Sequence, residues 1–205
     1  MTLVSTVTRV PQGVRTRAMR QRLLDATVEC LVDLGWSGTS TTLVSQRAGV
    51  SRGAQLHHFP TKADLVLAAV EHLNEARIQG LQEAADRLPV GPGRTRAVLE
   101  MLADHFTSPV FIAALELWVA ARTDPALREA VAPLEQRIGR DTHRSTVEWL
   151  GLDESRPGMR ELVQATLDLV RGLGLANTIS DDARRRARIL DQWADSLDRA
   201  LKEPQ

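Results

Sequence analysis

Tyrosine is absent from this 205-residue sequence, which also has only three phenylalanines and one cysteine. Since Cys30 stands alone, an intramolecular disulfide is impossible, and nothing points to an oxidising compartment. No stretch reaches the roughly 18 to 20 apolar residues of a membrane span, and the N-terminus lacks the pattern of a signal peptide. The sequence therefore predicts a cytoplasmic protein that is neither secreted nor embedded in a membrane.

Strand-forming clusters of valine, isoleucine, threonine and aromatic residues are also missing. Alanine, leucine, arginine, glutamate and aspartate recur instead at helical spacing, and 43% of the residues are hydrophobic, which is enough for a core. These patterns predict an all-α fold of about nine helices.

The formal net charge of zero conceals an uneven distribution of charge along the chain. Residues 1–62 carry eight basic and three acidic side chains, whereas residues 63–205 carry 18 basic and 23 acidic ones. A basic N-terminal segment is the charge pattern expected of a nucleic-acid-binding module, because cationic side chains release counterions from a duplex.

Residues 39–62 have the pattern of a helix-turn-helix. Ser40 can cap a first short helix, and Gly49 supplies a residue that tolerates positive φ where that helix must stop. Ser51 can cap a second helix, which Phe59-Pro60 ends because the residue before a proline avoids helical geometry. In such a unit the second helix lies in the DNA major groove.

Three parts of the chain are expected: a flexible arm at residues 1–15, the helix-turn-helix domain at residues 16–62, and a second helical domain at residues 63–205. The arm is either a frayed terminus or a minor-groove contact through Arg9 and Arg15. One predicted helix covers residues 17–34 and precedes the helix-turn-helix. After it, helices are predicted from the Thr61/Asp64 capping box to about residue 88, over 94–106, and, as an apolar central helix, after Pro109. Three more follow, which cover 125–150, begin at Arg156-Pro157, and begin with Ser180 as the cap.

The N-terminal residues resemble those of the TetR-type transcriptional regulators. The resemblance covers about 50 residues in the family's order. It is carried by Leu24, Ala26, Leu34-Gly35, Gly38-Thr39-Ser40, Val44, Ala48-Gly49-Val50-Ser51, Gly53, His58-Phe59, Lys62 and Leu65. It implies a three-helix DNA-binding head on a larger helical domain that dimerises and binds a small-molecule effector.

The resemblance also implies roles for individual residues. Base contacts are expected from Thr42, Arg52, Gly53 and His57, and phosphate contacts from Thr41, His58 and Lys62. The chemistry agrees, because an arginine can donate two hydrogen bonds to guanine and a glycine lets the backbones approach closely.

The sequence departs from the family at Gln55-Leu56, where Leu-Tyr is usual and the tyrosine hydroxyl reaches a phosphate. Either this contact is lost, or the helix is turned so that Leu56 packs inward and Gln55 faces DNA, where its amide could read adenine. His57 and His58 also have metal-ligating side chains, but neighbours on a helix point about 100° apart and no third ligand is near, so we expect no metal.

The family pattern places an effector pocket and a dimer interface in the second domain. A cavity among the central helices would be lined by Met101, His105, Phe106, Phe111, Leu115, Trp118, Trp149 and Leu169, with core packing as the plain alternative. The last two helices would pair with their copies in a homodimer through Leu162, Leu169, Leu173, Ile189, Trp193 and Leu197.

The leading interpretation is a repressor that binds a palindromic double-stranded DNA operator as a dimer and is released by a mostly apolar small molecule. Two alternatives stay open: a DNA-binding dimer without an effector, and an all-helical enzyme using His105, Asp104, Glu116 or His143. The sequence has no nucleophile elbow, metal-spaced cluster or phosphate-binding glycine loop, so we expect neither enzymatic activity nor a cofactor.

Overall fold

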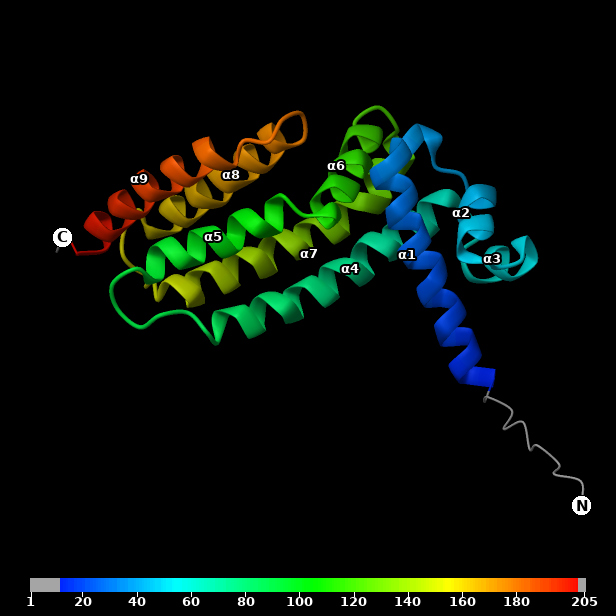
Figure 1. The fold of residues 1–205 in the computed structure, drawn as a ribbon, viewed down its shortest axis with the longest axis horizontal. Coiled ribbons are helices and arrows are strands. Elements are labelled where there is room, and N and C mark those ends of the chain that lie inside the picture. Colours follow the sequence, from blue (N-terminus) through cyan, green and yellow to red (C-terminus); the bar gives the residue numbers. More distant parts are fainter. Residues whose placement is uncertain (1–11, 203–205) are drawn as a thin grey trace, which may run out of the picture. The chain divides into compact units, whose positions relative to one another are not determined.

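The computed structural model describes residues 12–202, and every regular element of that part is an α-helix, which confirms the all-α prediction (Figure 1). The predicted arm at 1–15 falls mostly outside the described residues, and residues 12–15 begin a helix. The helices are α1 (Gln12–Gly38), α2 (Thr41–Ala48), α3 (Arg52–His58), α4 (Lys62–Ala85), α5 (Arg94–Phe106), α6 (Pro109–Ala121), α7 (Pro125–Leu150), α8 (Met159–Asn177) and α9 (Ala183–Lys202).

The chain forms two compact units that divide between Ala69 and Val70, inside α4. In the first unit, α1 packs on α2 and α2 on α3. The helical spacing of α1 is confirmed, because Leu23, Leu24, Thr27, Cys30 and Leu31 are all fully buried. Gly35 interrupts the helix with φ of 65°, as predicted, and one further turn follows. Leu34, just before Gly35, is 46% exposed.

In the second unit, α5 is the central helix. It packs against α6, α7, α8 and α9, and Figure 1 shows it between the α8–α9 pair and α7. The sequence placed the apolar helix after Pro109 at the centre, and this was wrong. That helix, α6, packs against α5 and α7 and leaves Val119 56% exposed, because apolar residues on all sides do not by themselves bring neighbours to every side.

Most helix starts follow from local capping rules. The Thr61 N–H donates to Oδ2 of Asp64 at 3.0 Å, and the Asp64 N–H donates to Oγ1 of Thr61 at 3.1 Å, which completes the predicted capping box. Likewise, Oδ1 of Asp124 accepts from the Leu127 N–H at 3.0 Å.

Two predicted starts were wrong. Arg156 and Pro157 lie in a turn, and α8 begins only after Gly158, whose φ of 82° suits glycine. The last helix is not capped by Ser180. Asp181 takes that role, since its Oδ1 accepts from the Ala183 N–H at 3.0 Å.

Among the described helices, none taken singly has the length and apolar composition that a membrane span requires. The consecutive helices α5 and α6 meet that criterion only as a pair, and they are bent by 56° relative to one another.

Candidate nucleic-acid interface and ligand cavity

The turn between α2 and α3 is built by three small residues. Ser40 caps α2, its Oγ accepting from the Leu43 N–H at 3.2 Å, and Ser51 caps α3, accepting from the Ala54 N–H at 3.3 Å. Between them Gly49 adopts φ of 62° and ψ of 39°, a left-handed conformation that side chains disfavour. The sequence prediction of a helix-turn-helix with these caps is confirmed.

The outward face of α3 presents the side chains expected to read bases. Arg52, Gly53 and His57 are exposed, and a Cβ added at Gly53 would meet nothing within 4 Å. The Arg52 Nη1 donates to Oγ1 of Thr42 at 3.4 Å, which links the start of α3 to the start of α2. These four residues therefore share one surface, as a base-reading face requires.

Gln55 and Leu56 resolve the alternative that the sequence left open, and Gln55 as a DNA contact was wrong. Gln55 is fully buried, and its Nε2 donates to the Phe59 carbonyl at 2.6 Å, whereas Leu56 is 41% exposed. The helix is thus not turned to bring Gln55 outward. The Phe59 carbonyl, one turn later, satisfies the amide donor, whereas Oε1 of Gln55 is buried without a hydrogen-bond partner.

The three predicted phosphate contacts are only partly accessible. Thr41, His58 and Lys62 are all half-buried. The Lys62 ammonium donates to the Trp36 carbonyl and lies 4.1 Å from the centroid of the Trp36 ring. Partial burial lowers the pKa of Lys62. An ammonium has three donors, so donors remain for a phosphate oxygen.

Further basic side chains lie along α1. Arg15, Arg17 and Arg22 are exposed, while the Arg20 guanidinium lies 5.5 Å from the centroid of the Phe59 ring. Arg20 therefore helps to hold the end of α3 in place by a cation–π contact.

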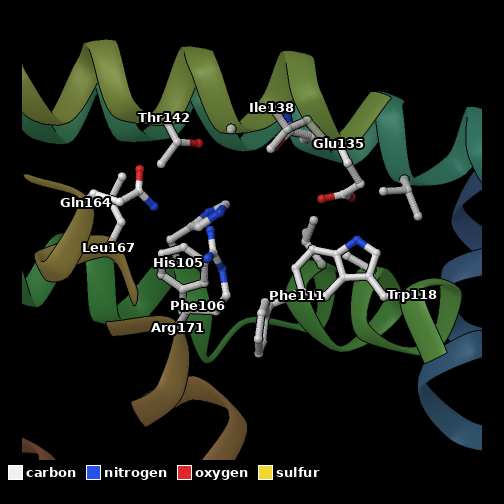
Figure 2. Close-up of a pocket in the computed structure, with 15 residues that line it drawn as sticks. His105, Phe106, Phe111, Trp118, Glu135, Ile138, Thr142, Gln164, Leu167 and Arg171 are labelled. Carbon is white, nitrogen blue, oxygen red and sulfur yellow. The ribbon is translucent and has the colours of Figure 1, made fainter. Parts of the chain in front are cut away.

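The second unit contains a cavity of about 170 Å³ (Figure 2). Its walls come from α4, α5, α6, α7 and α8. The lining residues are Val70, Asn74, His105, Phe106, Val110, Phe111, Ala114, Trp118, Glu135, Ile138, Gly139, Thr142, Gln164, Leu167 and Arg171.

Half of the predicted pocket residues line this cavity. His105, Phe106, Phe111 and Trp118 do, and their rings form a chain of edge-to-face contacts, with centroids 5.0, 5.4 and 5.9 Å apart. The other four do not line it. Met101 and Trp149 pack in the α5-centred core, Leu115 lies elsewhere on α6, and Leu169 is on the outer side of α8.

Sequence reasoning missed the polar wall of the cavity. Glu135, Ile138, Gly139 and Thr142 follow one another at helical spacing along α7, which is a signal the sequence does contain. Asp104 and Glu116, on which the enzyme alternative relies together with His105, are not among the lining residues.

Several polar atoms of the lining are buried without a hydrogen-bond partner. They are Nδ1 of His105, Nε1 of Trp118, Oε1 of Glu135 and Nε of Arg171. Burial, with a contribution from Arg77, lowers the pKa of His105 from 6.5 to about 4, so this imidazole is neutral near pH 7. Burial raises the pKa of Glu135, and the Trp118 indole and Arg171 oppose that shift. Unpaired buried polar atoms around a cavity are the arrangement expected of a ligand site.

The outer face of α8 and α9 carries a shallow apolar groove. It is lined by Leu169, Arg185, Arg188, Ile189, Gln192 and Trp193. Of the predicted interface residues, Leu162, Leu169, Ile189 and Trp193 are half-buried and reach the surface. Leu173 and Leu197 were wrong as interface residues, because they are 4% and 1% exposed and lie in the core of their own chain.

No group of three His, Cys, Asp or Glu side chains in residues 12–202 is placed to hold a metal ion. His57 and His58 lie in edge-to-face contact with ring centroids 5.3 Å apart.

A capped helix-turn-helix followed by a larger helical unit defines the chain as a helix-turn-helix transcriptional regulator. The family profile of the bacterial regulatory proteins of the tetR family matches residues 23–69. The chain is 34% identical over 184 residues to the HTH-type transcriptional regulator CymR of Pseudomonas putida, covering 87% of this chain and 88% of that protein. It belongs to the TetR family, whose members are regulators and not enzymes.

Two further comparisons agree with this assignment. The HTH-type transcriptional regulator BetI of Pseudomonas aeruginosa is 28% identical over 186 residues, which cover 89% of this chain and 92% of BetI. The crystal structure of a transcriptional regulator from Rhodococcus sp. Rha1 matches the fold with a TM-score of 0.70, covering 91% of this chain and 99% of that chain at 22% identity.

Proposed function

We propose that this regulator is a cytoplasmic repressor that binds a palindromic operator as a homodimer and is released by a small molecule bound in the cavity of its second unit. The observation that carries the proposal is the exposed face of α3, where Arg52, Gly53 and His57 stand beside Thr42. The experiment that tests it is to sequence the DNA fragments selected by the pure protein. A palindrome with half-sites about 10 base pairs apart, or a multiple of that spacing, is the expected result.

Base reading in this proposal combines donors with an apolar contact. The Arg52 guanidinium donates to guanine O6 and N7, and Thr42 orients it through their shared hydrogen bond. Leu56, exposed between Gly53 and His57, offers an apolar surface to the methyl group of a thymine instead of a phosphate contact.

Arg52→Ala is expected to relax base preference at one position per half-site and to cost about 1–3 kcal/mol at the selected operator. The physical reason is the loss of two charge-assisted hydrogen bonds to a base edge. Fluorescence anisotropy titrations with the operator and with a random duplex measure both effects. Equal losses on the two duplexes would contradict the assignment.

Two variants provide controls for that experiment. Arg47→Ala removes another arginine of the same unit, but this side chain is ion-paired with Asp33 at 2.8 Å, so base preference should not change. Lys62→Ala should weaken binding to all DNA sequences alike. The slope of log affinity against log salt concentration should become shallower by about one.

The α8–α9 groove supports the homodimer part of the proposal. An apolar strip flanked by Arg185 and Arg188 leaves Leu169, Ile189 and Trp193 to be covered by another surface. A two-fold copy would supply such a surface and would present two heads to a palindrome.

The variant Leu169→Glu is expected to dissociate the dimer, because it would bury a carboxylate among the apolar side chains of Ile189 and Trp193. Multi-angle light scattering at micromolar concentration measures the molar mass. Val119→Glu is the matched control, since it places the same charge at an exposed valine of α6 outside the groove. A monomeric wild-type protein would refute the proposed dimer interface along α8 and α9.

Release of DNA by a ligand would act by population shift. A ligand that binds best when two heads are wrongly spaced for major grooves about 34–36 Å apart would lower operator affinity. A 100-fold effect needs a coupling of about 2.7 kcal/mol, and operator DNA must weaken ligand binding by the same factor.

The main alternative is a DNA-binding dimer without any effector. Four unpaired buried polar atoms on residues that line the cavity favour an effector site, since a purely structural core leaves few such atoms.

A further inference from the structure

The cavity holds a buried carboxylate that has no basic side chain at ion-pairing distance in the described part of the chain. Glu135 extends from α7 into the cavity, and its Oε1 is buried without a hydrogen-bond partner (Figure 2). Within residues 12–202, no Lys, Arg or His nitrogen lies within 4.0 Å of this carboxylate. A buried anion without a partner is costly, so a bound cation would relieve that cost.

The other titratable groups of the lining form no ion pair with Glu135. Arg171 is ion-paired with Asp168 at 2.8 Å, and its guanidinium lies 5.6 Å from the centroid of the Phe106 ring. His105 is neutral above pH 5, because burial and Arg77 lower its pKa to about 4. Glu135 is therefore the acidic side chain of the described lining, and it has no ion-pair partner.

Aromatic rings stand next to this carboxylate. The Trp118 indole nitrogen points toward Glu135 and, with Arg171, opposes the rise in its pKa that burial causes, and Phe111 packs edge-to-face on Trp118 at 5.9 Å (Figure 2). Ring faces attract cations, most strongly when water is excluded. A carboxylate in a cavity that aromatic side chains also line is complementary to an organic cation, because the carboxylate can match its charge and the rings its apolar body.

The size of the cavity limits the ligand. A dry protein cavity of about 150 Å³ is enough to hold benzene. At about 170 Å³, this cavity has room for one ring and a short polar arm. We propose that it binds a protonated amine on an apolar body of about one ring, with the ammonium group against Glu135. The inference deepens the proposed function, because it names the ligand class of the effector cavity.

Calorimetry on the protein alone, with three probes that share one ring and differ in charge, tests the proposal. They are 2-phenylethylamine as the cation, 2-phenylethanol as its neutral counterpart, and phenylacetate as an anion. At pH 7 the cation is expected to bind at least 10-fold more tightly than the alcohol, and phenylacetate more weakly than either. Phenylacetate or the alcohol binding as tightly as the amine would overturn the proposal.

Glu135→Gln keeps the shape of the side chain and removes its charge. This variant is expected to lose at least 10-fold in amine affinity while its affinity for the alcohol changes less than twofold. Glu129→Gln, at an exposed position of the same helix, is the matched control and should change neither affinity. Retention of the amine preference in Glu135→Gln would overturn the assignment.

A second readout uses only the wild-type protein. Burial raises the pKa of Glu135 above 4.5, so a bound ammonium, which requires the ionised form, should lose affinity as the pH falls from 7 towards 4.5. Alcohol binding should not follow that trend, and His105 stays neutral over most of this range. An amine affinity that is as flat with pH as that of the alcohol would count against Glu135 as the anionic partner.

The ligand class and the regulatory role can fail separately. An amine that binds through Glu135 but leaves operator binding unchanged supports the ligand class and refutes release by this ligand. Release of DNA by a compound that ignores Glu135, with no amine binding, refutes the ligand class and leaves the repressor intact.

Discussion

Gly174→Ala is expected to lower the free energy of unfolding by about 3 kcal/mol or more, which is at or beyond the upper end of typical overpacking costs. A Cβ at this position of α8 would lie 2.2 Å from the Phe106 carbonyl oxygen and 2.9 Å from its carbonyl carbon. These are backbone atoms of the central helix α5, so no side-chain rotation can relieve the clash. The two helices would have to separate, which would also disturb the cavity wall at Phe106.

The matched control, Gly172→Ala, should have the opposite sign. Gly172 is exposed, lies two residues earlier in the same helix, and a Cβ there would meet nothing within 4 Å. Alanine favours a helix interior by about 0.5–1 kcal/mol over glycine. Gly80→Ala, equally open in α4 and outside the proposed dimer interface, should behave in the same way. Urea unfolding measures all three, and equal stability of the Gly174 and Gly172 variants would contradict the close approach.

The second large effect concerns pH. Burial lowers the pKa of His105 from 6.5 to about 4, so between these values the unfolded chain binds a proton that the folded chain does not. Folding stability should therefore rise with pH from 4 to 6.5 and be lost as the pH falls through that window. At about 1.4 kcal/mol per pKa unit, this group alone accounts for about 3 kcal/mol.

His105→Gln isolates this contribution, because the difference in unfolding free energy between wild type and variant should vary by that amount between pH 6.5 and 4. Glu135 acts in the opposite direction, since its raised pKa makes the folded state lose stability as the pH rises above 4.5. Because both proteins contain Glu135, its contribution cancels in the difference between them. Imidazole chemical shifts give a direct check. A His105 ring that titrates near 6.5 would rule out the effect.

Local rules predicted the elements of the first unit well. Ser40, Gly49 and Ser51 act where they were placed, because capping depends on residues three positions apart or fewer. The same rules failed for Ser180, where the aspartate that follows it offers a carboxylate to the helix N-terminus.

The residues that line the cavity could be predicted only in part, because they depend on packing between helices and not on local rules. Periodicity marks which face of a helix is apolar, but it does not say which neighbour that face meets. Trp149 and Trp118 look equivalent in sequence, yet only Trp118 reaches the cavity. Gln55 shows the converse, because this polar residue is fully buried and its Nε2 donates to the Phe59 carbonyl.

The uninterrupted course of α4 across the boundary at Ala69 and Val70 fixes the angular phase between its two ends. Its capping box lies in the first unit, and Val70 and Asn74 line the cavity of the second. At about 100° per residue, one residue inserted or deleted between these points would rotate one end against the other by more than a quarter turn. Length changes of seven residues, about two full turns, would nearly restore the phase. Within α4 itself, the helical phase between Lys62 and Asn74 thus depends on the number of residues between them and not on which residues they are.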